Sequence, residues 1–288
     1  MTVRWLVTGA GGQLGQRVQA RLAAAGDEFV AVTRAELDIA DPDSVGALLD
    51  AHRPAVVINA AAYTKVDDAE AHEADADRVN HIGAKVLAEA VARTGGRLVH
   101  VSTDYVFAGD ADRPYEITDP TGPRSAYGRT KLAGERAVLA ALPDRGHVVR
   151  SAWVYGGPGP NFVDTMLRLE AERDTVDVVT DQIGSPTSAA DLAAALVKLG
   201  RSAVPGGLLH FVNAGQGSWR DLACETFRLA GADPSRVRPT DTASFPRPAP
   251  RPAWSVLSTT AWTSAGLTAP RPWQDALADV IAEREIAE

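Results

Sequence analysis

Short apolar runs rich in valine alternate with longer alanine- and leucine-rich segments through the first half of the chain. The short runs mix in few polar residues, as expected for strands that a parallel sheet buries on both faces. The predicted strands are Val3–Thr8, Phe29–Thr33, Val56–Asn59, Leu98–Ser102 and Val148–Ser151. The predicted helices are Leu14–Ala25, Asp43–Ala51, Ala74–Thr94 and Tyr127–Ala141. Repeated alternation of strand and helix predicts an α/β fold with a doubly wound parallel sheet.

The pattern changes after Ser151, where glycines and prolines at 156–160 predict a loop. The later predicted elements are helix 161–173, strand Val176–Thr180, helix Ser188–Leu199, strand Leu208–Val212, helix Ser218–Ala230 and helix Trp273–Glu285. The proline-rich segment Pro239–Pro252 is expected to be extended and without regular structure. We therefore expect one domain at residues 1–155 and a smaller one mainly at 156–288, with some later segments returning to the first.

Composition and charge narrow the function classes. The 288 residues are 45% hydrophobic and 23% charged, with a formal net charge of −8. An acidic chain without a long basic run does not favour binding to nucleic acid or to an anionic membrane. The single cysteine, Cys224, excludes an internal disulfide framework. The longest apolar run, Ala55–Ala62, is too short to span a bilayer, and the N-terminal residues do not resemble a secretory signal, so we expect a cytoplasmic protein.

A glycine loop stands between the first predicted strand and the first predicted helix. It reads Gly9-Ala-Gly-Gly12-Gln13-Leu14-Gly15, with the spacing G-x-x-G-x-x-G. Glycines allow backbone amides to approach a pyrophosphate at a helix N-terminus, where the helix dipole favours anions. A tight turn that binds no ligand is the alternative, but the position between strand and helix favours a dinucleotide site.

The end of the second predicted strand indicates which dinucleotide binds. Arg34 stands where an acidic residue would bind the ribose hydroxyls of NAD, and an arginine can pair with the 2′-phosphate of NADP. Glu36 is the alternative carboxylate if the strand ends later, so NAD also stays open. Asp38 and Ile39 are then expected to contact the adenine.

Two further motifs carry candidate chemistry. Tyr127 and Lys131 are four residues apart, which places both side chains on one face of a helix. A nearby ammonium stabilises a phenolate, and this lowers the pKa of a tyrosine toward the range of a useful acid–base group. Ser102 and Thr103 end a predicted parallel strand, where side chains face the ligand crevice, so a hydroxyl there can polarise a substrate carbonyl.

The motifs together resemble one family, the dTDP-4-dehydrorhamnose reductases, over nearly the whole chain. The matching segments are the glycine loop, Asn59-Ala-Ala-Ala-Tyr63-Thr-Lys-Val66-Asp67, Ser102-Thr-Asp104-Tyr105-Val-Phe107, Tyr127-Gly-Arg-Thr-Lys131-Leu-Ala-Gly-Glu135, Ser151-Ala-Trp153-Val-Tyr155, Asp181-Gln182-Ile-Gly184-Ser-Pro186-Thr187, and Arg251-Pro252 with Ser255 and Leu257. The resemblance implies a Rossmann-like domain with a smaller C-terminal substrate-binding domain. It also implies transfer of a hydride from NADPH to the 4-keto carbon of a dTDP-linked deoxysugar.

The resemblance also implies roles for individual residues. The implied catalytic set is Thr103, Tyr127 and Lys131. The implied cofactor contacts add Ala60, Ala61, Ala62 and Tyr63 to the glycine loop, Tyr127 and Lys131. The implied substrate contacts are Val66, Asp67, Thr103, Asp104, Tyr105, Phe107, Tyr127 and Trp153.

Local chemistry separates related families. Related dehydratases carry a catalytic glutamate at the position where this chain has Tyr105. Related epimerases carry an acidic residue at the position where this chain has Arg34. Some members of the reductase family have glutamates around magnesium at a dimer contact. This chain instead has Gln16 and, at 188–191, Ser-Ala-Ala-Asp, so no metal is expected, while a homodimer stays open. The rival functions are a reductase of another nucleotide-linked 4-keto deoxysugar and a non-catalytic NADP-binding regulatory subunit.

The proline-rich segment contains two candidate cations, Arg247 and Arg251. A nucleoside diphosphate needs a local positive charge on an acidic protein, and the guanidinium fork of arginine suits phosphate oxygens. We expect one of these arginines near the diphosphate, with Trp153 closing over the sugar or the base. The alternative is that both merely solvate an extended loop.

Overall fold

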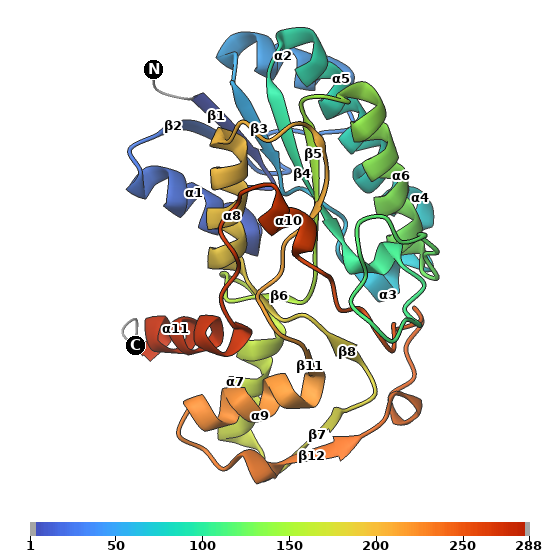
Figure 1. Cartoon of the computed structure of the whole chain (residues 1–288), viewed down its shortest axis with the longest axis vertical. Coiled ribbons are helices and arrows are strands. Elements are labelled where there is room, and N and C mark those ends of the chain that lie inside the picture. The colour runs from blue at the N-terminus through green and yellow to red at the C-terminus, as the bar shows by residue number, and fades with distance from the viewer. Residues whose placement is uncertain (1–3, 286–288) are drawn as a thin grey trace.

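A six-stranded parallel sheet forms the centre of the computed structural model, which describes residues 4–285 (Figure 1). The strand order is β10-β5-β4-β3-β1-β2. These strands are β1 (Arg4–Thr8), β2 (Glu28–Val32), β3 (Val56–Asn59), β4 (Arg97–Thr103), β5 (Gly146–Ser151) and β10 (Gly207–His210). The predicted doubly wound parallel sheet is confirmed, although Val3, the expected first strand residue, lies outside the described residues.

Helices cover both faces of the sheet, as Figure 1 shows. One layer contains α1 (Gln13–Ala24) and α8 (Ala189–Arg201), and the other contains α2 (Pro42–His52), α5 (Ala84–Thr94) and α6 (Ala126–Ala141). Strand β1 shows how the sheet is shared between them. Trp5 and Val7 pack into the core under α1 and α8, whereas Leu6, between them, packs into the other core. This double burial explains the weak alternation in the sequence of the strands.

The predicted helix Ala74–Thr94 is not a single α-helix. Short helices α3 (Val66–Ala69) and α4 (Glu73–Asp77) precede a π-helical segment, η1 (Arg78–Gly83), which continues into α5. The wider turn of this π-helix directs the Asn80 side chain toward two partners in other segments. Its Oδ1 accepts the Tyr63 N–H at 2.8 Å, and its Nδ2 donates to Thr130 Oγ1 at 3.1 Å. The expectation of regular helix was therefore wrong at 78–83, where a π-segment aims a polar side chain inward, as is common near functional sites.

Most of the remaining elements form a smaller body below the sheet in Figure 1. Its main elements are α7 (Phe162–Glu172), β7 (Val176–Val179), α9 (Trp219–Leu229), β12 (Val237–Thr240) and α11 (Trp273–Glu285). Short strands connect it: β6 (Val154–Tyr155), β8 (Ile183–Gly184), β9 (Thr187–Ser188) and β11 (Gly217–Ser218). Single turns lie at η2 (Asp104–Val106), η3 (Pro234–Arg236), η4 (Thr242–Ser244) and α10 (Thr260–Ser264), of which η2 lies against α6 and α10 against β10. The later segments α8 and β10 join the large sheet instead, beside α1 and β5.

The start of the proline-rich segment corrects a second expectation. Pro239 lies inside β12, which pairs in parallel with β7 and places Pro239 opposite Val178. A proline is tolerated there because β12 has a strand neighbour on one side only, so its missing N–H breaks no ladder. Regular structure therefore extends to Ser244, and the expected irregular chain begins after it.

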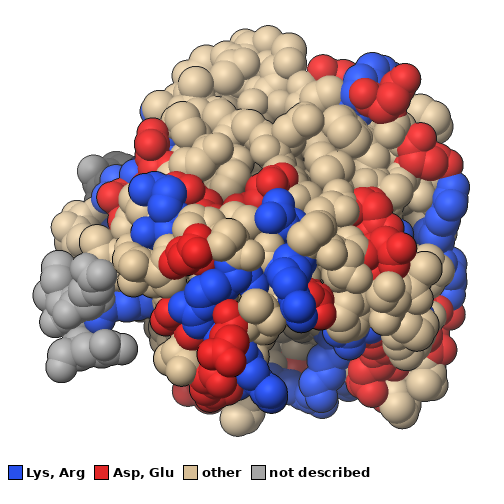
Figure 2. All heavy atoms as spheres, turned by 90° about the horizontal axis from the view of Figure 1, so that it is seen from below, with Lys and Arg blue, Asp and Glu red and all other residues tan. Residues whose placement is uncertain are grey.

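No helix among residues 4–285 is both long and apolar enough to cross a membrane. Seen from below, Lys and Arg lie beside Asp and Glu over much of the surface, without a broad patch of one sign (Figure 2).

Candidate active site

A cavity of about 820 Å³ lies at the carboxyl ends of the parallel strands. It is lined by most of the residues that the sequence singled out: Gly9, Gly12, Gln13, Leu14, Gly15, Arg34, Ala60, Ala62, Val66, Thr103, Asp104, Tyr105, Tyr127, Lys131 and Trp153. Candidate cofactor, catalytic and substrate residues thus share one crevice. This is where ligands bind in open α/β sheets.

The start of α1 fits the pyrophosphate of a dinucleotide. Its N-cap, Gly12, provides no side chain to satisfy the first backbone N–H groups, and no acidic residue lies in the first turn. These donors and the positive end of the helix dipole therefore face the cavity and attract anions. Gly15 allows the close approach of helix and loop, because a Cβ there would lie 2.2 Å from Gly9 O.

Arg34 is the candidate phosphate ligand. It is exposed on the cavity wall and has no hydrogen-bond or ion-pair partner among residues 4–285. Glu36, the alternative ribose ligand, is already engaged: its Oε2 accepts the Thr33 N–H and hydroxyl, each at 2.8 Å. The donor set on this wall therefore fits a 2′-phosphate better than a ribose diol.

Several predicted cofactor residues do not line the cavity. Asp38 pairs with Arg78, which lowers the pKa of the Asp38 carboxyl, and Ile39 is buried in the core. Ala61 donates its N–H to Asn59 Oδ1 at 3.1 Å, and the Tyr63 hydroxyl donates to Asp68. Their predicted cofactor contacts remain predictions.

Tyr127 and Lys131 lie on the buried face of α6, on the wall of the cavity. Burial raises the pKa of Tyr127 to about 12 and lowers the pKa of Lys131 to about 8. The Lys131 ammonium donates to Val101 O at 2.6 Å. Sequence reasoning expected a lowered tyrosine pKa, but burial outweighs the favourable contacts here. Tyr127 therefore holds its proton at neutral pH, as a proton donor must.

Thr103 and Asp104 form a hydrogen-bonded pair at the end of β4. The Thr103 hydroxyl donates to Asp104 Oδ1 at 2.9 Å and accepts the Tyr105 N–H at 3.3 Å. Burial raises the pKa of Asp104 to about 6. The Thr103 hydroxyl must turn away from this carboxyl before it can donate to a substrate oxygen.

A stacked tryptophan pair forms the wall of the cavity toward the smaller body. The Trp153 and Trp219 rings lie 3.6 Å apart with an interplanar angle of 6°. Trp153 has a φ of 47°, a left-handed conformation that a non-glycine residue adopts only under strong constraint. The Trp219 indole donates to Gln182 Oε1 at 3.1 Å. Sequence reasoning missed Trp219, because its helical segment shows only amphipathic spacing.

A smaller cavity of about 170 Å³ adjoins the first one and shares Tyr105 with it. Arg251 lines it and pairs with Asp67, whose Oδ2 lies 2.7 Å from Arg251 Nη2. Burial opposes ionisation of Asp67, but the Arg251 guanidinium prevails and lowers the pKa of this carboxyl. Phe107 also lines this small cavity and stacks on Tyr115 at 4.1 Å. Asp67 and Phe107 thus lie beside the small cavity rather than on the wall of the main one.

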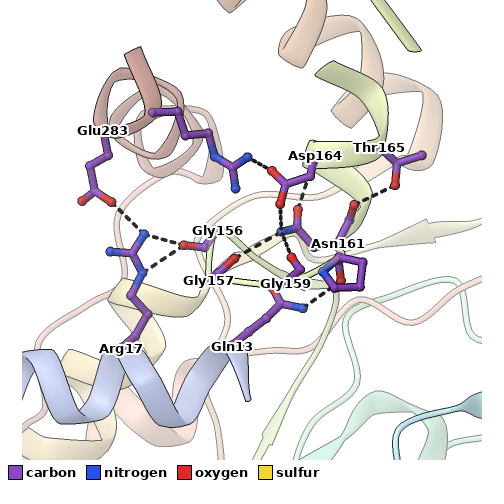
Figure 3. Close-up of polar contacts among 11 residues, drawn as sticks. Gln13, Arg17, Gly156, Gly157, Gly159, Asn161, Asp164, Thr165 and Glu283 are labelled. Carbon is purple, nitrogen blue, oxygen red and sulfur yellow. Dashed lines mark hydrogen bonds and ion pairs between the residues drawn. The ribbon is translucent and has the colours of Figure 1, made fainter. Parts of the chain in front are cut away.

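The loop 156–161 is tied to the first turns of α1, as Figure 3 shows. Gln13 Nε2 donates to Pro160 O at 3.3 Å, and Arg17 Nε donates to Gly156 O at 3.0 Å. Arg17 also pairs with Glu283 of α11 at 2.7 Å, and Asn161 caps α7 while its amide donates to carbonyls of the same loop. The start of α1 is therefore held by segments from the second half of the sequence.

Among residues 4–285, no cluster of three or more His, Cys, Asp or Glu side chains is arranged to hold a metal ion.

Arg17→Leu should weaken both folding and NADPH binding, because it releases loop 156–161 and Glu283 from α1. We expect a loss of about 1 kcal/mol in the free energy of unfolding and an NADPH Kd at least about threefold higher. Arg21→Leu is the matched control, since Arg21 lies one turn further along α1 and has no ion-pair partner in the described part of the chain. Urea unfolding and fluorescence titration measure both effects. Equal effects in the two variants would show that the loop contact plays no part in NADPH binding.

Comparison with known proteins finds relatives that match nearly the whole chain. A family model, the RmlD substrate binding domain, matches residues 3–286. A dTDP-4-dehydrorhamnose reductase of Streptomyces griseus is 52% identical over 280 residues, covering 96% of this chain and 92% of the relative. A dTDP-4-keto-6-deoxy-D-glucose reductase of Streptomyces niveus is 50% identical over 277 residues, covering 96% of each chain. The solved dTDP-4-dehydrorhamnose reductase of Bacillus anthracis, in complex with NADP, superposes with a TM-score of 0.94 at 37% identity and covers 98% of this chain and 100% of its own.

Proposed function

The chain belongs to the RmlD substrate-binding family, and we propose that it reduces the 4-keto group of dTDP-4-dehydro-6-deoxy-L-mannose, giving dTDP-L-rhamnose, with NADPH as the reductant. The observation that carries the proposal is that Thr103, Tyr127 and Lys131 line the same cavity as the glycine loop and Arg34. A non-catalytic NADP-binding subunit would not need this set.

Bound NADPH supplies the hydride, and the protein supplies the proton and the orientation. Tyr127, which keeps its proton at neutral pH, donates it to the substrate oxygen. Thr103, released from Asp104, hydrogen-bonds the same oxygen and polarises the carbonyl. Lys131 holds the ribose and places its positive charge beside the phenol. Trp153 and Trp219 offer an apolar wall suited to the unsubstituted C6 of a deoxysugar.

Residues outside this crevice complete the proposal. Residues 156–288 serve mainly in substrate binding, while α8 and β10 extend the cofactor sheet. A cytoplasmic location and a homodimer remain predictions.

The decisive assay mixes the purified protein with NADPH and dTDP-4-dehydro-6-deoxy-L-mannose and follows the loss of NADPH absorbance. We expect turnover in the wild type and a kcat lower by at least about 100-fold in Tyr127→Phe, with NADPH still bound. A fall of less than about tenfold would remove Tyr127 as the principal acid.

The second candidate function is reduction of a different sugar, because the Streptomyces niveus relative is named for dTDP-4-keto-6-deoxy-D-glucose. The same assay with that compound separates the two candidates. We expect kcat/KM to be at least about tenfold higher for the L-manno substrate, which corresponds to about 1.4 kcal/mol. The reverse order would assign the D-gluco sugar.

Arg34→Asp should shift the cofactor preference toward NADH, because it removes the phosphate partner and supplies a carboxylate for the ribose hydroxyls. We expect the ratio of kcat/KM for NADPH to that for NADH to fall by at least about tenfold. Arg21→Asp makes the same charge change away from the cavity and should leave the ratio unaltered. An unchanged ratio in Arg34→Asp would show that Arg34 does not read the phosphate.

Arg251→Ala and Arg247→Ala should raise the KM for the sugar nucleotide without changing NADPH affinity, if this segment binds the diphosphate. Arg251 lines the small cavity, and Arg247 is close enough that its charge lowers the pKa of Asp67. Arg238→Ala is the control, because Arg238 of β12 pairs with Asp177 of β7 and lines neither cavity. A change of KM below about twofold in both test variants would exclude the segment as the phosphate clamp.

A further inference from the structure

A buried ion pair lies behind the candidate catalytic residues. Arg150 Nε donates to Glu135 Oε1 at 2.8 Å, and Arg150 Nη2 donates to Glu135 Oε2 at 2.7 Å. The Ser102 hydroxyl donates to Glu135 Oε1 at 2.6 Å. Each side chain of the pair is only 3% exposed. Both carboxylate oxygens are therefore engaged, in the two-pronged geometry that gives the strongest charged hydrogen bonds.

Packing alone does not account for such a pair. Removing two charges from water costs several kcal/mol for each ion, and apolar residues of equal volume often stabilise a core as well or better. The surroundings of Arg150 are partly apolar, since its guanidinium lies 4.8 Å from the centre of the Phe107 ring. The position of the pair, directly behind the candidate catalytic residues, points to a role in the reaction.

Each member of the cluster is joined to a different part of the site. Glu135 lies one turn beyond Lys131 and two turns beyond Tyr127 on the buried face of α6. Ser102 directly precedes Thr103 in β4, and it faces Arg150 across the β4–β5 ladder. The carboxylate therefore links α6 to the strand end that carries Thr103.

Lys131 has few other charges around it. Its ammonium is buried at 2% exposure and has one hydrogen-bond acceptor, Val101 O. On β4, His100 faces Lys131 as a neutral group, because burial and the Lys131 charge hold the pKa of His100 well below its ordinary value. One turn before Lys131 on α6, Tyr127 stays protonated, and the charge of Asp104 further raises the pKa of Tyr127. Burial lowers the pKa of Lys131 to about 8, and the charge that opposes this fall is Glu135.

We propose that Glu135 is a positioning residue for the reduction, which keeps Lys131 charged in its buried site and fixes the β4 end that carries Thr103. The proposal rests on the function proposed above. Arg150 holds the carboxylate in place and satisfies it, whereas Lys131 receives its field.

The test is the pH dependence of Glu135→Gln, which keeps the size of the side chain and removes its charge. In the wild type, the ammonium of Lys131 is lost as pH rises through about 8, so kcat/KM should fall above that pH. Without Glu135 the pKa of Lys131 is lower, so the fall should begin about one pH unit earlier. At alkaline pH this corresponds to a loss of about tenfold relative to the wild type. Below about pH 7 the loss should be no more than about threefold.

Two further variants keep the test decisive. Glu135→Gln leaves the buried charge of Arg150 without its partner and could therefore prevent folding. In that event the test uses the double variant Glu135→Met and Arg150→Met, which removes both charges. Its fall in kcat/KM should also begin earlier than in the wild type, but by less than in Glu135→Gln, because the positive charge of Arg150 is removed with the carboxylate. Glu170→Gln breaks the partly buried pair of Glu170 with Arg236, remote from both cavities, and should leave the pH profile unchanged. A folded variant lacking Glu135 with the wild-type profile would overturn the proposal, even if its thermal stability were lower.

NADPH binding gives a readout that does not depend on the sugar. Fluorescence titration should show the wild-type NADPH Kd rising above about pH 8 and that of Glu135→Gln rising about one unit earlier. If this difference appears but neither sugar nucleotide is reduced, the proposed function fails and the role of Glu135 stands. If turnover is normal and neither readout shifts, the role of Glu135 fails and the function stands.

Discussion

At Gly128, helix α6 approaches the segment after β4 more closely than any side chain would allow. The arrangement of the candidate catalytic residues depends on this contact. A Cβ on Gly128 would lie 2.2 Å from the Tyr105 carbonyl oxygen. The helix can therefore rest directly on the backbone that follows Thr103, and the face carrying Tyr127 and Lys131 reaches the strand ends. Any side chain at position 128 would push α6 away from this backbone and so move Tyr127 and Lys131 away from Thr103.

The elements around this contact divide the work between the two halves of the chain. The parallel sheet brings the glycine loop, Arg34 and Thr103 to one edge, because all its carboxyl ends point the same way. The smaller body then closes that edge with aromatic and cationic side chains, among them Trp219 and Arg251. In the proposed function, the candidate cofactor contacts thus come from the sheet and α1, and the candidate sugar contacts come partly from the smaller body.

The parallel sheet, the NADP preference and the family were predictable from the sequence, because each depends on local signals. The almost wholly apolar run Val56–Asn59 indicates a strand that is buried on both faces. The spacing of the glycine loop and the charge of Arg34 indicate a dinucleotide with a 2′-phosphate. The π-segment around Asn80 was not predictable, since its helix has ordinary periodicity and the cause lies in partners elsewhere, Tyr63 and Thr130. Pro239 led to the wrong expectation that its segment has no regular structure. The strand β12 tolerates this proline because it pairs with β7 on one side only, and the sequence does not show that pairing. The roles of the individual site residues still rest on resemblance and geometry together.

The bond between Arg17 and Glu283 joins residues 266 positions apart in the chain. During synthesis, α1 leaves the ribosome long before loop 156–161 and α11 have been made. The start of α1 gains all of these contacts only once α11 has formed and docked. The geometry at the strand ends therefore depends on chain that is made much later than the glycine loop itself.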